Sequence, residues 1–456
     1  MPAPATDFEQ ALEDFLYSRD GDTDTTSKSP EEVLREAAED PPEELTSGQT
    51  DAWRDILTRL SGATASGQMA SLLGAAGTGK TFLLTRIAGR LEEMGLKVLA
   101  VAPTHQAVGQ IEKLFSGDSI TVNTIQSALG LRLQRDGRGG YQLVPEGEAD
   151  VSQYDLIIAD EASMIGRELW THVEVSGYGS DLRWLFVGDP YQLPPVNEAP
   201  SPALEQPGAK LTEIVRQAQN NPIIDLATRI RNGGSFYPLP EETTNGELGI
   251  YQVRQHEATE KAARAIEKDP TGTRVLAWRN KAVGKWCRRI KNRLYPDAGR
   301  FAEGMHMLAR EGYSPPDTPV IKFHTSALLE VKEARKTDTQ LGSAGPRVPA
   351  WSLDLKEKAS GQPHTGVYVP RGQGEQLLED YTEKMAGQEQ WSEYYEAKEQ
   401  FAALRYSAAS TVHKSQGQSH RTTLVDVSDL KACREEFQEL AYVAATRPEK
   451  HLVLIV

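Results

Sequence analysis

The sequence predicts an α/β protein made of two similar domains, each a parallel sheet with helices on both faces. From residue 45 onward, short β-rich runs alternate with amphipathic helical stretches, which is the pattern of such sheets. Four runs precede residue 190 and three follow residue 270, so we expect a cleft between two domains. The predicted strands are Ala70–Leu73, Val98–Ala102, Leu156–Ala159, Trp184–Val187, Arg274–Ala277, Thr423–Val427 and Leu452–Val456.

Length and composition define the class of protein. With 456 residues the chain is long enough for about two to four domains. Its two cysteines are too few for a disulfide framework or a cysteine-rich zinc site. No apolar run approaches the roughly 18 residues of a membrane span, and the first residues lack the features of a signal peptide. We therefore expect a cytoplasmic protein.

The net charge of -15 is concentrated at one end of the chain. Residues 1–44 hold 14 Asp or Glu against 3 Lys or Arg, which leaves 51 acidic and 47 basic residues for the rest. The body is therefore almost neutral, and a basic channel lined by some of its Lys and Arg is compatible with this balance. Residues 1–44 are predicted to be a disordered extension, because much of the segment is rich in Asp, Glu, Ser, Thr and Pro. Apolar residues between Phe8 and Leu16 recur at helical spacing, so a short amphipathic helix is expected there.

The most constrained motif is a glycine-rich loop between the strand that ends at Leu73 and a predicted helix, Phe82–Met94. Glycines let backbone N–H groups surround phosphates, the lysine reaches the terminal phosphates, and the last hydroxyl ligates Mg²⁺. We therefore predict a site for a nucleotide and Mg²⁺. Its residues are Gly74, Ala75, Ala76, Gly77, Thr78, Gly79, Lys80 and Thr81.

Two acidic residues follow the apolar strand Leu156–Ala159, at the edge where parallel sheets bind ligands. Asp160 can hold the metal ion together with Thr81, directly or through water. Glu161 is placed to orient or deprotonate the water that attacks the γ-phosphate. After the next predicted strand, Gln192 is available to sense the same phosphate.

Eight motifs occur in the order found in one protein family. They are LTSGQ at 45–49, GAAGTGKT at 74–81, APTHQAV at 102–108, DEAS at 160–163, GDPYQLPPV at 188–196, LTEIVRQ at 211–217, TVHKSQG at 411–417 and YVAATRP at 442–448. On these motifs the chain from residue 45 to residue 456 resembles the superfamily 1B helicases, most closely their small phage and RecD-type members. The QLPP form resembles the 5′-to-3′ branch of the superfamily.

The resemblance implies a domain organisation. Residues 45–215 would form a first RecA-like domain that binds ATP, and residues 216–298 with 404–456 a second RecA-like domain. Residues 299–403 would be an SH3-like and helical insertion. Near 131–145, residues alternate around an Asp-Gly turn, which predicts a β-hairpin. It resembles the family's pin, a wedge that splits the duplex, although a hairpin without that role would have the same sequence.

The resemblance also completes the nucleotide site. Gln49 would recognise adenine, and Arg216, Gly417 and Arg447 would contact ATP. Guanidinium groups stabilise the charge of a transferred phosphoryl group. Arg447 would come from the second domain, so its engagement with ATP would close the cleft.

Contacts with single-stranded DNA are implied in both domains. Phosphate binding needs only well-placed hydroxyls, amides and cations, so we expect no sequence readout. Two positions depart from the family pattern. Gln126 replaces a common histidine, and Arg279, beside Asn280, either contacts phosphate or is solvated. The implied DNA contacts are Pro103, Thr104, His105, Thr124, Asn280, Thr411, His413 and Lys414.

The sequence thus predicts an ATP-dependent 5′-to-3′ DNA helicase of replication, recombination or repair, with ATP and Mg²⁺ as cofactors and single-stranded and fork DNA as partners. A translocase that strips proteins from single strands, a nucleotide-dependent switch and a RecD-like subunit of a nuclease complex are the alternatives. For the acidic residues 1–44 we hypothesise binding to a single-strand-binding protein or replisome component, or coverage of the basic channel.

Overall fold

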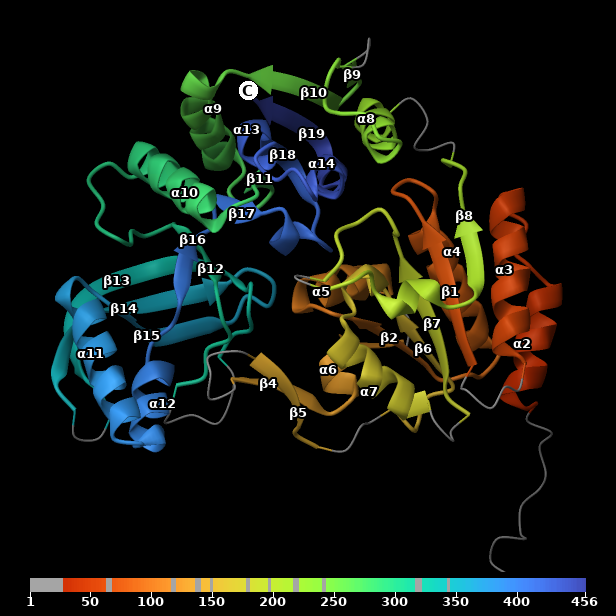
Figure 1. Cartoon of the computed structure of the whole chain (residues 1–456), viewed down its shortest axis with the longest axis horizontal. Helices are drawn as coiled ribbons and strands as arrows, with labels where there is room; N and C mark the ends of the chain where they lie inside the picture. Colours follow the sequence, from red (N-terminus) through yellow and green to blue (C-terminus); the bar gives the residue numbers. More distant parts are fainter. Residues whose placement is uncertain are drawn as a thin grey trace, which may run out of the picture.

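The computed structural model describes residues 28–62, 68–115, 120–135, 141–147, 151–177, 181–195, 198–215, 221–239, 243–315, 322–342 and 345–456. They contain two six-stranded sheets, a five-stranded sheet and a two-stranded hairpin (Figure 1). The two larger sheets confirm the predicted α/β class. Within the described ranges, no helix is both long and apolar enough to cross a membrane.

The first sheet has the strand order β3-β2-β6-β7-β1-β8, and all of its pairs are parallel. Parallel strands end at a common edge of the sheet, so the segments after β1, β2, β6 and β7 lie near one another. These segments contain the glycine-rich loop, Asp160, Glu161 and Gln192 of the predicted nucleotide site, together with the predicted DNA contacts Pro103, Thr104 and His105. The strands are β1 (Gln68–Gly74), β2 (Val98–Ala102), β3 (Thr121–Thr124), β6 (Leu156–Ala159), β7 (Arg183–Gly188) and β8 (Gly208–Leu211).

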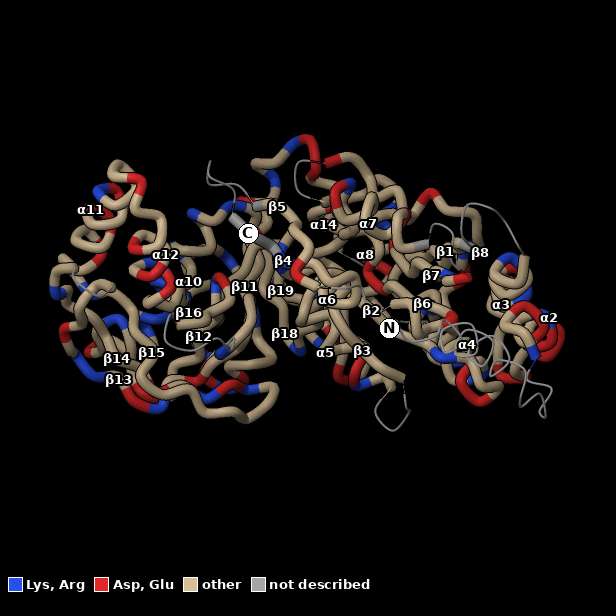
Figure 2. The backbone as a smooth tube through the Cα atoms, turned by 90° about the horizontal axis from the view of Figure 1, so that it is seen from below, with Lys and Arg blue, Asp and Glu red and all other residues tan. Residues whose placement is uncertain are grey.

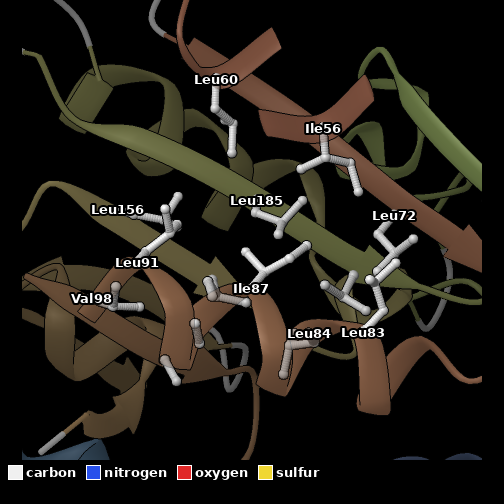
Figure 3. Close-up of a cluster of buried hydrophobic side chains, with 14 of the residues drawn as sticks. Ile56, Leu60, Leu72, Leu83, Leu84, Ile87, Leu91, Val98, Leu156 and Leu185 are labelled. Carbon is white, nitrogen blue, oxygen red and sulfur yellow. The ribbon is translucent and has the colours of Figure 1, made fainter. Parts of the chain in front are cut away.

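Each face of the first sheet buries its own apolar core. Figure 3 shows one of them, in which Ile56 and Leu60 approach Leu185 from one helix and Ile87 and Leu91 approach from another. The opposite face packs on Ile125, Leu169 and Val173, among others. Helices on both faces hold the strands rigidly, which fixes the edge where the site lies. The helices are α3 (Ser47–Leu60), α4 (Lys80–Glu93) and α5 (His105–Leu114) on the first face, with α6 (Ile125–Ala128) and α7 (Arg167–Gly177) on the second.

Residues 30–39 correct the prediction of a disordered extension over 1–44. They form the helix α2 (Pro30–Glu39), which starts with a capping box between Ser29 and Glu32. Val33, Leu34, Ala37 and Ala38 are buried against the first domain. The helix contains few large apolar residues, and its small alanines allow it to pack closely on α3. Figure 2 shows acidic residues along this helix, and their number concealed the apolar face from a judgement based on composition.

Two contacts connect α2 to the interior of the first domain. The Trp53 Nε1 of α3 donates to Ala37 O at 2.7 Å. The fully buried Arg183 guanidinium forms an ion pair with Glu31 and donates to Leu60 O at 2.9 Å. The expected helix near Phe8–Leu16 lies outside the described residues.

The second sheet has the order β17-β11-β18-β19-β10-β9, and it is parallel except at its β9 edge. Its strands are β9 (Thr244–Asn245), β10 (Leu248–Val253), β11 (Thr273–Ala277), β17 (Ala409–Thr411), β18 (His420–Asp426) and β19 (Pro448–Ile455). One face packs on α9 (Gln255–Lys268) and α10 (Asn280–Leu294), and the other on α8 (Pro222–Arg231), α13 (Val427–Leu430) and α14 (Phe437–Thr446). Val427, predicted to end a strand, instead begins α13.

The insertion is an antiparallel sheet of order β15-β14-β13-β12-β16 with two helices against it (Figure 1). The core under α9 and α10 continues into it through Met307, Leu329 and Leu353. The insertion and the second sheet therefore share one apolar interior. Its elements are β12 (His306–Ala309), β13 (Leu328–Gln340), β14 (Arg347–Glu357), β15 (Pro363–Pro370), α11 (Gln373–Gly387), α12 (Trp391–Glu399) and β16 (Leu404–Tyr406).

The boundary predicted at residue 404 needs a small correction. Strand β16 pairs with β12 of the insertion, and the chain returns to the second sheet only at β17. The predicted hairpin is present as β4 (Leu131–Arg135) and β5 (Tyr141–Pro145), and Figure 1 shows it between the first domain and the insertion. Its turn lies outside the described residues, and the wedge role stays a prediction.

Candidate nucleotide and nucleic-acid site

The glycine-rich loop has a backbone that larger residues would not fit. A Cβ on Gly74 would lie 2.6 Å from Thr78 Oγ1 and 3.0 Å from Leu211 O. Gly79 has a φ of +82°, which favours glycine, and a Cβ there would lie 2.4 Å from Gln49 Nε2. Lys80 lies over the loop, and its Nζ donates to Gly74 O at 2.7 Å and to Ala75 O at 3.0 Å. The loop thus turns tightly between β1 and α4, with Thr81 exposed in the first turn of the helix.

Gln49 is buried beside this loop. Its Oε1 accepts a hydrogen bond from Thr46 N at 3.1 Å, and Gln49 N donates to Thr46 Oγ1 at 3.3 Å. This capping box starts α3, and it fixes the carboxamide next to Gly79. The structure therefore places Gln49 at the loop, where its recognition of adenine remains a prediction.

Asp160 and Glu161 follow β6 in an unusual backbone conformation. Glu161 has a φ of +53°, in the left-handed region that non-glycine residues rarely adopt. Glu161 N donates to Asp160 Oδ1 at 2.8 Å, which holds the two residues in a tight turn. Burial and the Glu161 charge raise the pKa of Asp160 above its usual range, while that hydrogen bond and the Lys80 charge oppose the rise. A cation here would relieve the repulsion between the two carboxylates.

The turn after β7 carries Gln192 toward the second domain. Gln192 N donates to Asp189 O at 3.1 Å, and the side-chain Oε1 is buried without a hydrogen-bond partner in the described part of the chain. Burial of an unpaired acceptor costs free energy. We therefore expect this oxygen to accept a hydrogen bond from a water molecule or a ligand. The adjacent Leu193 packs into the apolar core of the second domain.

Arg447 lies just after α14, and its guanidinium is held by the second domain. It donates to Val443 O at 3.2 Å, to Ser415 O at 3.4 Å and to Gln418 O at 3.1 Å. Gly417 lies between these acceptors with a φ of +65°, and a Cβ on it would be 3.7 Å from Glu161 Cγ. Arg447 thus reaches the first domain indirectly, through a loop that touches the acidic pair. Arg216 lies outside the described residues.

The predicted DNA contacts of the first domain lie at the starts of two helices. Thr104 caps α5 by accepting from Ala107 N at 3.2 Å, and Thr124 caps α6 by accepting from Ser127 N at 3.1 Å. Helix N-termini favour phosphate, because their amide groups have no partner within the helix. Pro103 precedes α5, and its carbonyl accepts from Gln126 Nε2 at 3.5 Å, which connects the two helix starts.

His105 makes a contact that the sequence did not predict. Its ring stacks on His324 of the insertion with centroids 3.9 Å apart, and Gln106 Nε2 donates to Ser326 O at 2.8 Å. Ser326 has a φ of +67°, so a constrained turn of the insertion rests on the start of α5. Burial and the neighbouring His324 lower the pKa of His105 to about 4.

The second domain brings Thr411, His413 and Lys414 together at the end of β17. Lys414 N donates to Thr411 Oγ1 at 3.3 Å. Burial lowers the pKa of His413, although Glu436 lies 3.7 Å from its Nε2. Asn280 is exposed in the first turn of α10.

Arg279, which the sequence left either as a phosphate contact or as solvated, forms an ion pair with the buried Asp429. Arg279 Nε donates to Asp429 Oδ1 at 2.6 Å, and the backbone N–H groups of Trp278 and Arg279 donate to Asp429 Oδ2. Arg279 therefore has a structural partner within its own domain.

Sequence reasoning missed two cations beside Lys414. Arg310 follows β12, Arg405 lies in β16, and both line one small pocket with Lys414, Gln106 and Ser326. The Arg405 Nε is buried and has no hydrogen-bond partner in the described ranges. Burial and the two arginines lower the pKa of Lys414, with Glu311 opposing. No motif contains Arg310 or Arg405, and only the pairing of β12 with β16 brings them together.

Tyr442 of α14 makes the most direct contact between the two domains. Its Oη accepts from Ala76 N at 2.9 Å and donates to Asp189 Oδ2 at 2.6 Å. A second contact joins Gln416 Nε2 to Leu193 O at 3.0 Å. The glycine-rich loop, the turn after β7 and α14 therefore meet at one interface.

Two family models match the chain. Residues 44–247 match an AAA domain, and residues 406–455 match a UvrD-like helicase C-terminal domain. The chain is 26% identical over 440 residues to the ATP-dependent DNA helicase dda of Enterobacteria phage T4, a match that covers 89% of this chain and 98% of the phage protein. It is 32% identical over 195 residues to the ATP-dependent RecD2 DNA helicase of Deinococcus radiodurans, covering 42% of this chain and 25% of that protein.

Among solved structures, the chain is similar to the Pif1 helicase of Candida albicans, with a TM-score of 0.45 and 18% identity over 90% of this chain and 94% of that one. It is also similar to the Pif1 helicase from Bacteroides in complex with ADP-AlF3 and ssDNA, with a TM-score of 0.44 and 14% identity over 90% and 92% of the two chains.

The stacked histidines give a measurable prediction. We expect His105 to titrate with a midpoint of about 4 in the folded protein, against an ordinary value of 6.5. Because the pKa is lowered on folding, this contact stabilises the protein fully above about 6.5 and less as the pH falls toward 4. NMR titration of the His105 ring measures the midpoint. A His324→Ala variant should shift it upward, whereas a midpoint near 6.5 in the unmodified protein would contradict the stacked arrangement.

Proposed function

We propose that this chain, a homologue of the superfamily 1B helicases, is an ATP-dependent DNA helicase that moves 5′-to-3′ along single-stranded DNA and separates duplex strands. The observation that carries the proposal is the meeting of a phosphate-binding loop, an acidic pair and a second α/β domain at one interface. A motor needs this arrangement, because hydrolysis on one domain must change the placement of the other.

The residues of the first domain have separable parts in ATP hydrolysis. Loop amides and Lys80 bind the phosphates, and Gln49 lies where it can recognise adenine. Thr81 and Asp160 offer the oxygen ligands that Mg²⁺ prefers, and when bound the ion neutralises phosphate charge. Glu161 orients or deprotonates the attacking water, and the unpaired Gln192 Oε1 can accept a hydrogen bond from it.

The second domain supplies charge stabilisation and movement. Arg447 is hydrogen-bonded to the loop whose Gly417 approaches Glu161, so a small shift of that loop would bring the guanidinium toward the γ-phosphate. Arg216, at the predicted boundary between the two domains, is proposed for the same task. Closure on ATP and opening after hydrolysis would move the two DNA-binding surfaces relative to each other.

We propose that the DNA strand runs over the starts of α5 and α6 and past the end of β17. Arg310, Arg405 and Lys414 extend this path with positive charge, and none of the residues lining their pocket is acidic. The hairpin β4–β5 is proposed as the wedge at the fork. With α2 folded onto the first domain, the proposal of a single-strand-binding or replisome partner rests on the acidic residues before it, which lie outside the described ranges.

Strand-displacement assays on tailed duplexes test the function. We expect ATP-dependent separation of a duplex with a 5′ single-stranded tail and none with only a 3′ tail. Unwinding only from 3′ tails would refute the polarity. ATPase activity stimulated by single strands without any unwinding would favour a translocase, and ATPase activity that single strands do not stimulate would favour a switch.

Glu161→Gln should lower kcat for ATP by about 10²- to 10⁴-fold, because the water loses its base while the phosphate contacts remain. Lys80→Ala should reduce turnover to near background through loss of phosphate binding. A matched control is Glu174→Gln, an exposed position on α7. Steady-state ATPase assays measure the effects, and turnover like that of the unmodified protein in Glu161→Gln would remove the assigned role.

Arg405→Gln should weaken single-stranded DNA binding equally for all sequences and reduce the slope of log affinity against log salt by about 1, because one phosphate contact is lost. Arg264→Gln, on the exposed surface of α9, is the matched control. Fluorescence anisotropy at several salt concentrations provides both values. An unchanged slope with Arg405→Gln would place the strand elsewhere.

A further inference from the structure

Tyr442 is the first residue of the motif at 442–448, and none of the roles assigned above involves its hydroxyl. The side chain is 1% exposed, and it bridges two segments of the other domain, Ala76 in the glycine-rich loop and Asp189 after β7. Its ring lies edge-on to Tyr191 with centroids 6.2 Å apart. These contacts fix both the ring and the hydroxyl across the domain interface.

The direction of the two hydrogen bonds follows from the groups involved. Burial, followed by the negative charge of Asp189 and the hydrogen bond to it, raises the pKa of Tyr442 far above its usual range, so the phenol stays protonated. Its one proton goes to the Asp189 carboxylate at 2.6 Å, which leaves the oxygen lone pairs for Ala76 N–H at 2.9 Å. Tyr442 therefore acts on the loop as a hydrogen-bond acceptor.

Ala76 N–H belongs to a loop whose backbone amides serve to bind phosphate oxygens. An amide has one proton, and a well-directed hydrogen bond uses it for one acceptor. A phosphate oxygen that takes this proton displaces the tyrosine oxygen. The hydroxyl of the second domain and the phosphate of a nucleotide thus compete for the same group.

The competition bears on Arg447 through α14. Tyr442 lies in this helix, and Arg447 directly follows it with Nε hydrogen-bonded to Val443 O. Movement of Tyr442 away from the loop therefore moves the helix end that carries the arginine. We infer that Tyr442 is a positioning residue that occupies the Ala76 amide until phosphate takes it, so that nucleotide binding releases α14 and repositions Arg447. The consequence for movement rests on the proposed helicase function, whereas the competition concerns nucleotide binding alone.

Tyr442→Phe tests the inference because it removes the hydroxyl and keeps the ring. In the absence of DNA, we expect ADP and a non-hydrolysable ATP analogue to bind about two- to tenfold more tightly to the variant, since the competing acceptor is gone. Adenosine has no phosphate, so its affinity for the variant should equal its affinity for the unmodified protein. A merely structural role would leave phosphate binding unchanged or weaken it.

Tyr191→Phe is the matched control, because it removes a hydroxyl from the neighbouring ring, which lies outside the two hydrogen bonds of Tyr442. Calorimetric titrations measure the affinities, and a thermal melt of each variant confirms folding. Hydrogen exchange of the Ala76 amide gives a second measurement, which should be faster in Tyr442→Phe than in the unmodified protein without nucleotide. Equal or weaker nucleotide binding by a folded variant overturns the inference, as does unchanged exchange of Ala76.

Steady-state ATPase and unwinding assays, taken together with nucleotide affinity, separate this inference from the proposed function. With single-stranded DNA present, Tyr442→Phe should lower KM for ATP, because the competing acceptor is gone, and leave kcat close to that of the unmodified protein, because α14 is already released and Arg447 can take its position. If the unmodified protein fails to unwind DNA and the variant still binds nucleotide more tightly, the helicase proposal fails and the competition stands. If the unmodified protein unwinds DNA and the variant binds nucleotide no more tightly, the helicase proposal stands and the competition at Ala76 is refuted.

Discussion

The backbone of the glycine-rich loop is the constraint on which the rest of the first domain depends. Its amides can face a ligand only if the chain turns tightly, and the missing Cβ atoms of Gly74 and Gly79 allow Leu211 and Gln49 to approach. Val215 N donates to Gly77 O at 3.1 Å, so the end of the domain also rests on the loop. Elements from residue 49 to residue 215 are thereby fixed around one turn.

The second domain contacts the first through the residues that surround this loop. Tyr442, Gln416 and Gly417 reach Ala76, Leu193 and Glu161, which are respectively in the glycine-rich loop, the turn after β7 and the acidic pair. The insertion is connected to both domains. It shares one apolar core with the second sheet, and its turn at Ser326 contacts α5 of the first domain. A change at the glycine-rich loop therefore has a physical connection to every surface proposed to hold DNA.

Local patterns predicted much of the fold for a physical reason. Buried parallel strands are short apolar runs, and a strand, glycines, lysine and helix must be consecutive to form the loop, so both signals are contiguous in sequence. Prediction was wrong where composition opposed burial. Helix α2 is acidic on one face, and its apolar face consists largely of small residues, so only the packing on Trp53 and Arg183 identifies it as part of the domain.

By itself the sequence determined the class of fold, the glycine-rich loop between strand and helix and the order of the motifs, because each depends on residues close together along the chain. Only the tertiary structure decided which distant groups meet. The stacking of His105 on His324, the pairing of Arg279 with Asp429, the convergence of Arg310 and Arg405 on Lys414, and the hydrogen bonds of Tyr442 to Ala76 and Asp189 all join segments far apart in sequence. Such contacts leave no periodic signal, since they depend on how whole sheets are placed against one another.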